Sequence, residues 1–501
     1  MKKNVKKVLI IGAGISGLTA GSYLQRAGYH TEIYEAHNLP GGLCTSWQRK
    51  DYLFDGCIHS TLAPSEKYKL NQWFGELIDF NQIQYHYFEE LSRIRFENGQ
   101  EFVFYTDPDK LLQELLKIAP EDETFIHSLI KSVKAFAKYD LQMAKPIELW
   151  NPLDYYLRQF ITAPYIRHLT RWSKSLKETL CQCNNLYLKQ IINQDFFTRY
   201  PVYFFLLSLG QLYNKSAGYP IGGSLNIARQ LENTYIRLGG KIHYQSPVEK
   251  ILIENNKARG IVLNNGATKV DTDLVISAAD GYTTIFKLLE GKYTDKKIRK
   301  RYEEHPKWPS VILVSLGVAR SFSDTPSLID LRLEKPLEID PQTKTDMAPV
   351  TIYNFDPTLA PSGKTCLRVI LHTHNYGYWS ELRTNQHDTY IREKDRIGNA
   401  MVEILDQNLG NIKNKLEVMD VATPATFERY THNWQGSIQG WEWLPGLIPE
   451  LFSKTLPGLK NFYMTGQWVM PGGGVAGAFL NARDLVRIIC AKDGVKFTVK
   501  N

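Results

Sequence analysis

The sequence has little cysteine and no arrangement of cysteines that would bind a metal. Six cysteines are scattered over 501 residues, without the spacing of a disulfide framework or of a paired zinc site. This usage is typical of a protein in a reducing compartment, so we predict a cytoplasmic protein with no bound metal. The six are Cys44, Cys57, Cys181, Cys183, Cys366 and Cys490.

Long uncharged apolar segments are also missing. No stretch of about twenty such residues occurs, so no membrane-spanning helix is predicted. Four lysines in the first seven residues precede the apolar run Val8–Ile11, an order that resembles the start of a signal peptide. No small-residue cleavage site clearly follows, and we therefore expect a mature N-terminus.

The overall composition is that of a globular protein with two or three domains. Hydrophobic residues make up 43% of the chain and charged residues 22%, which does not favour disorder. The net charge of +8 favours anionic partners, but no nucleic-acid-binding module is recognisable, and no nucleic acid is expected to bind. Aromatic residues reach 12%, which is consistent with either a wide apolar cavity or an aromatic-rich core.

Periodicity predicts a β-α-β unit at the N-terminus and a helix-rich insertion after it. Val8–Ile11 and Thr31–Tyr34 have the pattern of buried strands, and Ser16–Ala27 between them has helical spacing that ends at Gly28. The insertion spans about residues 66–213. Its predicted helices are Lys110–Ile118, Glu123–Tyr139 and Tyr165–Leu180.

The second half of the chain is predicted to be strand-rich. A helix is expected at Leu225–Leu238, and a single clear helix, Ile391–Leu409, is expected between residues 283 and 456. The chain closes with a strand, a glycine-rich loop and the helix Ala476–Cys490. The predicted strands are Lys241–Tyr244, Val248–Glu254, Gly260–Leu263, Leu274–Ala278, Ser310–Val318, Ala348–Phe355, Cys366–Thr373 and Phe462–Thr465.

The first motif with chemical meaning is Gly12-x-Gly14-x-x-Gly17, placed between the first strand and the first helix. The glycines permit a tight turn, a close approach of a pyrophosphate to the backbone, and close packing of the helix on the strand. The N-terminus of the helix presents free N–H groups to the phosphates. Glu35, at the end of the second strand, is placed to accept a hydrogen bond from a ribose hydroxyl. The unit predicts a dinucleotide site.

Two further glycine segments favour FAD over NAD. Gly41 and Gly42 follow the second strand at once and let the backbone pass close to a cofactor. The segment Thr465–Ala478 again reads strand, glycine loop, helix, and a second helix N-terminus would place positive partial charge near the electron-rich end of a reduced flavin. An NAD site needs no such third element. No second complete GxGxxG unit is present, so the electron donor or acceptor stays open.

At these residues the chain resembles the FAD-dependent family of phytoene desaturases, carotenoid isomerases and retinol saturases, within the amine-oxidase-like flavoproteins. The similarity includes Gly41–Ser46, Phe54–His59, Ala217–Ser224 and Asp356–Thr365, together with the closing glycine loop. It is spread from residue 8 to residue 490 at low density, and it is weakest in the insertion.

The resemblance implies an α/β fold, α+β overall, with a Rossmann-like FAD-binding domain built from residues 1–65, 215–295 and 455–501. A substrate-binding domain with a mixed sheet and helices would come from residues 66–214 and 296–454. The candidate FAD-binding residues are Gly12, Gly14, Ile15, Ser16, Gly17, Glu35, Ala36, Gly41, Gly42, Leu43, Val248, Ser277, Gly466, Gln467, Gly474, Val475 and Ala476. Leu43 stands where many relatives have arginine, and Gln467 where many have an acidic residue.

Few acid–base residues are expected, because a flavin carries the redox chemistry and a hydrocarbon chain offers little to protonate. His59 is the one catalytic candidate, since the resemblance brings its segment near the flavin, where it would donate or remove a proton. A hydrogen-bonded structural histidine is the alternative. Trp468 is expected either to wall the flavin or substrate or to serve in ordinary packing.

The segment from about residue 155 to residue 180 combines cations with aromatic residues. Leu169, Trp172, Leu176 and Leu180 would share one face of a helix, with most of the cations elsewhere. This pattern is typical of a helix at a membrane surface, which would make the protein peripheral on the inner face of the membrane. A core-facing helix with a solvated basic face explains it as well.

These features together predict an FAD-dependent oxidoreductase acting on a hydrophobic unsaturated lipid of carotenoid, retinoid or isoprenoid type. The reaction would desaturate, saturate or isomerise C–C bonds. Two alternatives are kept: a flavin amine or amino-acid oxidase, which needs polar anchors for its substrate, and a non-catalytic FAD-binding protein.

Overall fold

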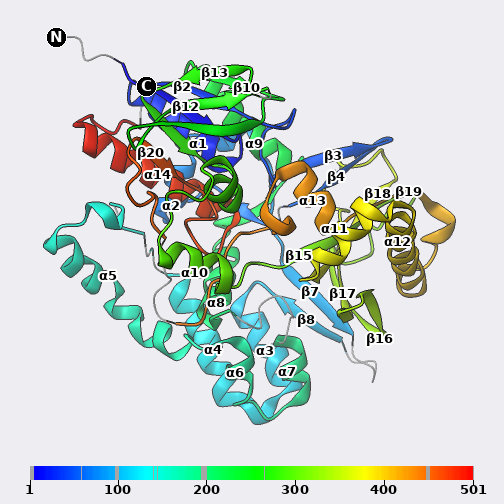
Figure 1. Cartoon of the computed structure of the whole chain (residues 1–501). Helices are drawn as coiled ribbons and strands as arrows, with labels where there is room; N and C mark the ends of the chain where they lie inside the picture. The colour runs from blue at the N-terminus through cyan, green and yellow to red at the C-terminus, as the bar shows by residue number, and fades with distance from the viewer. Residues whose placement is uncertain are drawn as a thin grey trace.

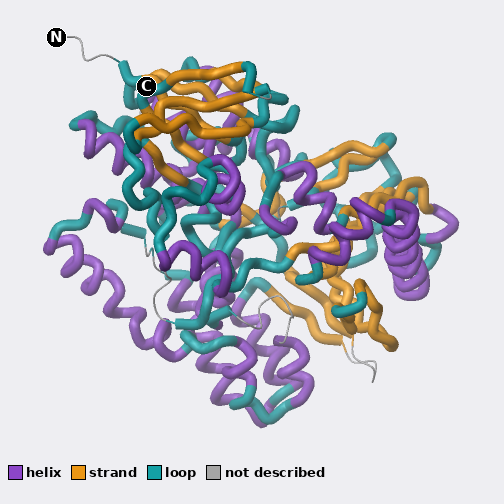
Figure 2. The backbone as a smooth tube through the Cα atoms, in the orientation of Figure 1, coloured by secondary structure: helices purple, strands orange, loops and turns teal. Residues whose placement is uncertain are grey.

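A computed structural model describes residues 5–57, 59–95, 101–138, 140, 142–143, 145–192, 200–264, 266–446 and 452–499. Figure 1 shows a sheet-containing part that holds the first and the last described residues, a second sheet beside it and a group of helices below. In Figure 2 the strands gather in the first two parts and the helices dominate the third. The ends of the chain meet through Lys6, whose Nζ lies 2.7 Å from Asp493 Oδ1.

A five-stranded parallel sheet forms the centre of the first part. Its order is β10-β2-β1-β14-β20, so strands far apart in the sequence become neighbours. The strands are β1 (Lys7–Ile11), β2 (His30–Tyr34), β10 (Lys241–His243), β14 (Leu274–Ser277) and β20 (Phe462–Met464). They come from the three stretches of sequence that the glycine motifs marked, as in a doubly wound α/β fold.

Both faces of this sheet are covered. Val8 and Ile10 pack with the helices α1 (Ile15–Arg26), α9 (Gly223–Arg237) and α14 (Gly474–Asp493), whereas Leu9 and Ile11 pack on the opposite side with an antiparallel sheet. That sheet consists of β11 (Val248–Glu254), β12 (Lys257–Leu263) and β13 (Thr268–Asp271). Because successive strand residues point to opposite faces, a continuous apolar run is needed to fill both cores.

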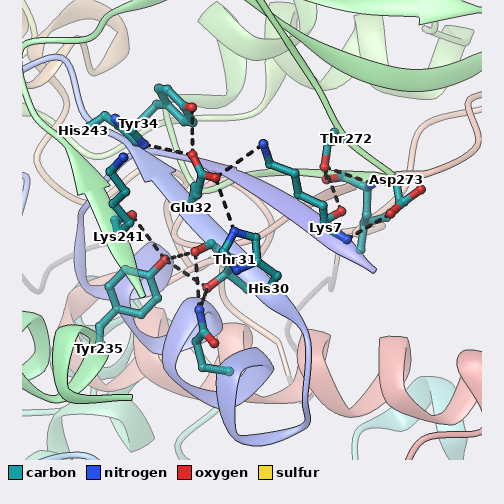
Figure 3. A network of polar contacts seen from close by, with 12 residues as sticks. Lys7, His30, Thr31, Glu32, Tyr34, Tyr235, Lys241, His243, Thr272 and Asp273 are labelled. Atoms are coloured by element: carbon teal, nitrogen blue, oxygen red, sulfur yellow. Dashed lines mark hydrogen bonds and ion pairs between the residues drawn. The ribbon is translucent and has the colours of Figure 1, made fainter. Parts of the chain in front are cut away.

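A polar network holds the edge of the parallel sheet (Figure 3). Glu32 on β2 bonds to His243 Nε2 at 2.9 Å and to the hydroxyl of Tyr34 at 3.1 Å, and it lies 3.4 Å from Lys7 Nζ. Burial alone would raise the pKa of Glu32, but the His243 bond and the Lys7 charge outweigh it and lower the pKa to about 2. Tyr235 of α9 donates to the carbonyl of Thr31 at 2.9 Å. The network fixes β2, whose end carries Glu35.

The second part is built on a seven-stranded mixed sheet. Its neighbours are antiparallel except for the parallel pair β16 and β7. Three helices, α11 (Tyr376–Asn385), α12 (His387–Leu409) and α13 (Pro424–Thr431), share its core. In sheet order the strands are β19 (Leu416–Ala422), β15 (Ser310–Val318), β18 (Thr365–Thr373), β17 (Thr343–Ile352), β16 (Leu328–Asp340), β7 (Glu90–Arg95) and β8 (Glu101–Tyr105).

The helical part has a core of its own, into which β7 and β8 also pack. Its first helix begins where the sequence supplies Asp107 as N-cap and Pro108 as first helical residue. The helices are α3 (Pro108–Ile118), α4 (Glu123–Phe136), α5 (Pro152–Arg171), α6 (Leu176–Leu180), α7 (Leu186–Ile192) and α8 (Val202–Tyr213).

Shorter elements connect the three parts. A hairpin of β3 (Ser46–Arg49) and β4 (Tyr52–Asp55) reaches the second sheet, and β5 (Thr61–Leu62), β9 (Ala217–Pro220) and β6 (Tyr85–His86) form a small sheet. The remaining helices are α2 (Lys69–Phe74) and α10 (Lys296–Glu304), with a π-helical turn at Thr283–Leu288. Within the described residues, no helix has both the length and the apolarity that crossing a bilayer requires.

The predicted helix Tyr165–Leu180 is wrong. The chain leaves helical geometry at Trp172 and starts a new helix at Leu176, because the Ser175 side chain and Glu178 form a capping box. Trp172, Leu176 and Leu180 are consequently buried in the helical core. The prediction that these residues form one membrane-facing side of a helix is therefore also wrong.

Other boundaries differ for identifiable reasons. The helix predicted at Glu123–Tyr139 ends at Phe136, and Tyr139 itself lies outside the described residues. The expectation of one helix between residues 283 and 456 is wrong: α10, α11 and α13 also form there. Helix α10 is only nine residues long and has no fully buried residue, and its apolar contacts with the core come from Ile298 and Tyr302, too few for its periodicity to be detected. The strand predicted at Ala348–Phe355 instead spans Thr343–Ile352.

Candidate functional site

One cavity of about 1110 Å³ connects the parallel sheet with the second sheet and helix α8. The residues that directly follow four parallel strands line it: Gly12 after β1, Glu35 after β2, Ala278 after β14 and Thr465 after β20. The carboxyl ends of parallel strands are the place where doubly wound folds bind ligands. The cavity is thus the candidate functional site.

Most of the predicted cofactor residues lie in the wall of this cavity. Those that do are Gly12, Gly14, Ile15, Ser16, Glu35, Ala36, Gly41, Gly42, Leu43, Val248, Gly466, Gln467, Gly474, Val475 and Ala476. Gly17 and Ser277 lie behind it. A Cβ on Gly17 would come within 2.0 Å of the Gly12 carbonyl oxygen, so this glycine lets helix and turn pack closely. The buried Ser277 hydroxyl bonds to Thr284 at 2.7 Å.

Two helix N-termini meet at the cavity. Helix α1 begins after Gly14 and α14 after Gly473; neither has a side-chain cap or an acidic residue in its first turn. Their free N–H groups and dipoles therefore favour negative charge at two separate points of one site. A Cβ on Gly474 would meet nothing within 4 Å, so this wall is open to a ligand. The arrangement fits a cofactor with a pyrophosphate at one end and an electron-rich ring at the other.

Glu35 holds the turn as well as facing the cavity. Its carboxylate accepts bonds from the backbone N–H of Ala13 at 2.6 Å and of His37 at 2.8 Å. These bonds join the end of β2 to the glycine turn after β1. The contact between Glu35 and a ribose hydroxyl stays a prediction.

Gln467 and Trp468 share a hydrogen-bond partner, Asn433, which also lines the cavity. Asn433 Oδ1 accepts from Gln467 Nε2 at 3.1 Å and from Trp468 Nε1 at 3.2 Å. Trp468 is buried among Trp434, Trp441 and Tyr302, and its carbonyl accepts from Trp441 Nε1 at 3.0 Å. These contacts favour the packing interpretation of Trp468, although the residue also lines the cavity.

A polar cluster that the sequence interpretation missed lies behind His59. Arg368 of β18 is 2% exposed, and it donates to the Asp55 carbonyl at 3.2 Å and to His59 Nδ1 at 3.3 Å. His59 lines the cavity and has accessible surface, although protein atoms crowd around its side chain. Burial, and then the charges of Arg368 and His372, lower the pKa of His59 to about 3. An arginine within the apolar strand Thr365–Thr373 was the available signal.

The rest of the cavity is predominantly apolar. Aromatic and aliphatic side chains from the helical part and from the second sheet enclose it, and Phe104, Leu209, Trp308, Leu313 and Val350 are all nearly inaccessible from outside. Further apolar lining comes from Phe88, Leu91, Phe204, Phe205, Leu212, Val311, Leu328, Ile329, Ile370 and Phe427. Among the described residues, no group of three or more His, Cys, Asp or Glu side chains could hold a metal ion.

Fold and site together define a flavoprotein with a dinucleotide-binding domain made of separated segments. The chain belongs to the flavin containing amine oxidoreductase family, whose pattern it matches over residues 15–490. Sequence relatives include the 4,4'-diapophytoene desaturase of Methylomonas sp, 26% identical over 99% of this chain and 97% of that protein. The all-trans-retinol 13,14-reductase of Danio rerio is 24% identical over 95% of this chain and 84% of its own.

A redesigned putrescine oxidase has the same fold, with a TM-score of 0.60 and 16% identity over 97% of this chain and 99% of that one. The predicted fold class, with a Rossmann-like domain and a second domain built on a mixed sheet, is confirmed. Family membership also confirms the predictions of an oxidoreductase and of FAD as its cofactor.

Proposed function

We propose that this FAD-dependent oxidoreductase acts on a long, hydrophobic, unsaturated lipid of carotenoid, retinoid or isoprenoid type. The reaction adds or removes hydrogen at C–C bonds of the chain, or isomerises them. The observation that carries the proposal is the continuity of the cavity, which runs from the glycine walls of the cofactor site into an apolar region. A polyene that occupies this region meets the cofactor without leaving apolar surroundings.

The size and the lining of the cavity support this substrate class. Its volume of about 1110 Å³ exceeds the roughly 300–1000 Å³ usual for one drug-sized ligand, which suits a cofactor together with an extended substrate. Apolar side chains bind a hydrocarbon chain by removing it from water. The names of the desaturase and the retinol reductase described above indicate that these relatives act on polyenes.

The chain's own residues have positioning tasks. Flavin supplies hydride transfer when bound. The turn at Gly12 and the N-termini of α1 and α14 hold the cofactor, and the walls formed by Phe104, Leu313 and Val350 orient the lipid and exclude water. In such a site orientation matters more than acid–base catalysis.

The alternative of an amine oxidase has less support, because carboxylates in the cavity wall that would anchor an ammonium group already accept hydrogen bonds from the protein. Asp280 accepts bonds from the N–H groups of Thr283 and Trp434, and burial raises its pKa to about 6. Asp420 accepts from Trp47 Nε1 at 3.0 Å and from Arg49 Nε at 3.1 Å. A purely FAD-binding role is not favoured by membership of an oxidoreductase family.

Filling the apolar region tests this function. Ser208 of α8 lines the cavity, and Ser208→Trp is expected to lower turnover of diapophytoene or all-trans-retinol at least about tenfold while FAD content stays unchanged, because the new side chain occupies the lipid's space. Products are measured by mass spectrometry as the gain or loss of hydrogen, or by a changed retention time for an isomer. Ser321→Trp, at an exposed position away from the cavity, is the matched control. Turnover of putrescine but of no polyene would contradict the proposal.

We further infer that the protein takes its lipid from a membrane surface through α5. Figure 1 shows this helix at the periphery of the molecule. Leu153, Tyr156 and Phe160 are 73%, 71% and 80% exposed, and with Leu157 they share one helical face by their spacing of three, four and seven. Arg167, Arg171, Lys174 and Lys177 continue the segment with exposed cations. An apolar face followed by cations suits an anionic bilayer.

Liposome binding tests this contact. The wild-type protein is expected to sediment with vesicles that contain phosphatidylglycerol, and salt is expected to weaken the binding because it screens the cations. Leu153→Ser/Tyr156→Ser/Phe160→Ser is expected to bind at least about tenfold more weakly, since it removes the apolar contact. The control is Ile236→Ser/Ile391→Ser/Leu444→Ser, which changes apolar residues that are exposed elsewhere. Equal binding by the two triple variants would exclude α5 as the contact.

A further inference from the structure

Arg368 places a buried positive charge in the wall of the cavity. None of the described residues forms a carboxylate ion pair with it at hydrogen-bonding distance: its partners are the Asp55 carbonyl and His59 Nδ1, and its guanidinium lies 5.4 Å from the Tyr353 ring centre. The nearby Asp55 carboxylate is bonded to Tyr219 and Ser224 instead. A buried charge without a directly bonded counter-ion is unfavourable unless its hydrogen bonds to the protein compensate for the loss of water.

The chemistry of the two groups determines how His59 is protonated. A guanidinium has N–H donors and no acceptor, so His59 Nδ1 must accept with its lone pair. The ring proton of the neutral imidazole is therefore on Nε2. A protonated imidazolium would set two donors against each other beside a positive charge, which is unfavourable, and the low pKa of His59 agrees with this.

The remaining polar atom of His59 belongs to the cavity. His59 lines the cavity and has accessible surface, Arg368 engages its Nδ1, and no acceptor for Nε2 is found among the described residues. A hydrocarbon placed against this N–H would strip it of water and leave it without a partner, which is costly. An oxygen atom in the same place would satisfy it.

We propose that Arg368 is a positioning residue that holds His59 as a neutral imidazole with its Nε2–H turned into the cavity, where it donates to an oxygen acceptor on the ligand. The substrate then carries a hydroxyl, carbonyl or carboxylate group on its unsaturated chain. This assignment of an oxygen-containing group to the substrate rests on the proposed function and deepens it. It also changes the predicted role of His59, which donates a hydrogen bond and does not act as a base.

The tautomer can be observed directly. In FAD-loaded protein with ¹⁵N-labelled histidine, the spectrum is expected to show His59 protonated at Nε2 and unprotonated at Nδ1, without titration between about pH 5 and 8. In Arg368→Met the pKa of His59 is expected to rise, because the Arg368 charge is gone, although burial and His372 still act on it. A role of Arg368 confined to stability would leave the tautomer and the pKa of His59 unchanged in that variant.

Ligand selectivity gives the second test, using parinaric acid, its alcohol and the corresponding hydrocarbon, titrated by fluorescence into the FAD-loaded protein. The wild-type protein is expected to bind the two oxygenated probes at least about tenfold more tightly than the hydrocarbon. His59→Phe and Arg368→Met are expected to lose this preference while they still bind the hydrocarbon. Arg320→Gln, which changes an arginine that donates to backbone carbonyls away from the cavity, is the matched control.

The outcomes separate this proposal from the proposed function. Equal binding of all three probes by the wild-type protein overturns the oxygen acceptor and leaves the lipid function standing, whereas no binding of any probe overturns both. If His59→Phe and Arg368→Met weaken FAD instead and keep the probe preference, the acceptor is a cofactor oxygen, and the assignment to the substrate is overturned. Should Arg368→Met fail to fold, His59→Phe alone still gives the selectivity result.

Discussion

Gly17→Ala is expected to weaken FAD binding about 100-fold. The added Cβ would come within 2.0 Å of the Gly12 carbonyl oxygen, a backbone atom of the turn that faces the predicted pyrophosphate. Helix α1 and this turn must therefore separate, which costs about 3 kcal/mol, the upper part of the usual range for overpacking. The separation also misaligns the N–H groups of the turn. Fluorescence titration of the apoprotein with FAD measures the loss.

The control for this prediction is Gly377→Ala. Gly377 lies in helix α11, and a Cβ there would meet nothing within 4 Å, so neither FAD binding nor folding is expected to change. Circular dichroism of both variants shows whether the fold is retained. A Gly17→Ala protein that binds FAD within about threefold of wild type would contradict the packing argument.

Arg483→Met is expected to destabilise the protein by about 3–5 kcal/mol, the cost of breaking a buried ion pair on one side. Arg483 on α14 is 5% exposed and donates to both carboxylate oxygens of Glu76 at 3.2 Å. Tyr23 of α1 donates to the same carboxylate, and the guanidinium lies 4.3 Å from the Trp73 ring centre. The cluster joins the two helices whose N-termini line the cavity. Chemical denaturation of the apoprotein measures the effect.

Two comparisons sharpen this result. Arg396→Met breaks an ion pair with Glu393 on the surface of α12, where a change of at most about 1 kcal/mol is expected. In Arg483→Met/Glu76→Gln the stranded negative charge is removed, so the double variant is expected to be more stable than the sum of the two single changes predicts. Equal effects of Arg483→Met and Arg396→Met would show that burial gives the pair no special importance.

The parts of the fold that could be predicted from sequence are those in which local chemistry and the global fold agree. Val8–Ile11 is apolar at every position because both faces of its strand are buried, and the glycine turn that follows needs backbone geometry that glycine readily supplies. The closing segment likewise needs, at Gly466 and Gly474, backbone geometry that glycine readily supplies. Because these signals mark the carboxyl ends of parallel strands, they also located many of the residues that line the cavity.

The parts that could not be predicted depend on long-range contacts. The apolar spacing of Leu169, Trp172, Leu176 and Leu180 is helical over its full length, yet the Ser175 capping box divides it and turns its members inward. The residues of the exposed apolar face of α5 lie close together in the sequence. Whether that face stays exposed, however, depends on how the rest of the chain packs. Arg368 lies 309 positions from His59 in the sequence, so only the folded chain shows that they meet.

The central claim is that the cavity at the carboxyl ends of the parallel strands binds FAD, and a visible absorption spectrum of the purified protein tests it most directly. The account predicts a yellow protein with flavin bands, and chromatography after denaturation should identify the released compound as FAD. A colourless protein that also takes up no added FAD would contradict the claim.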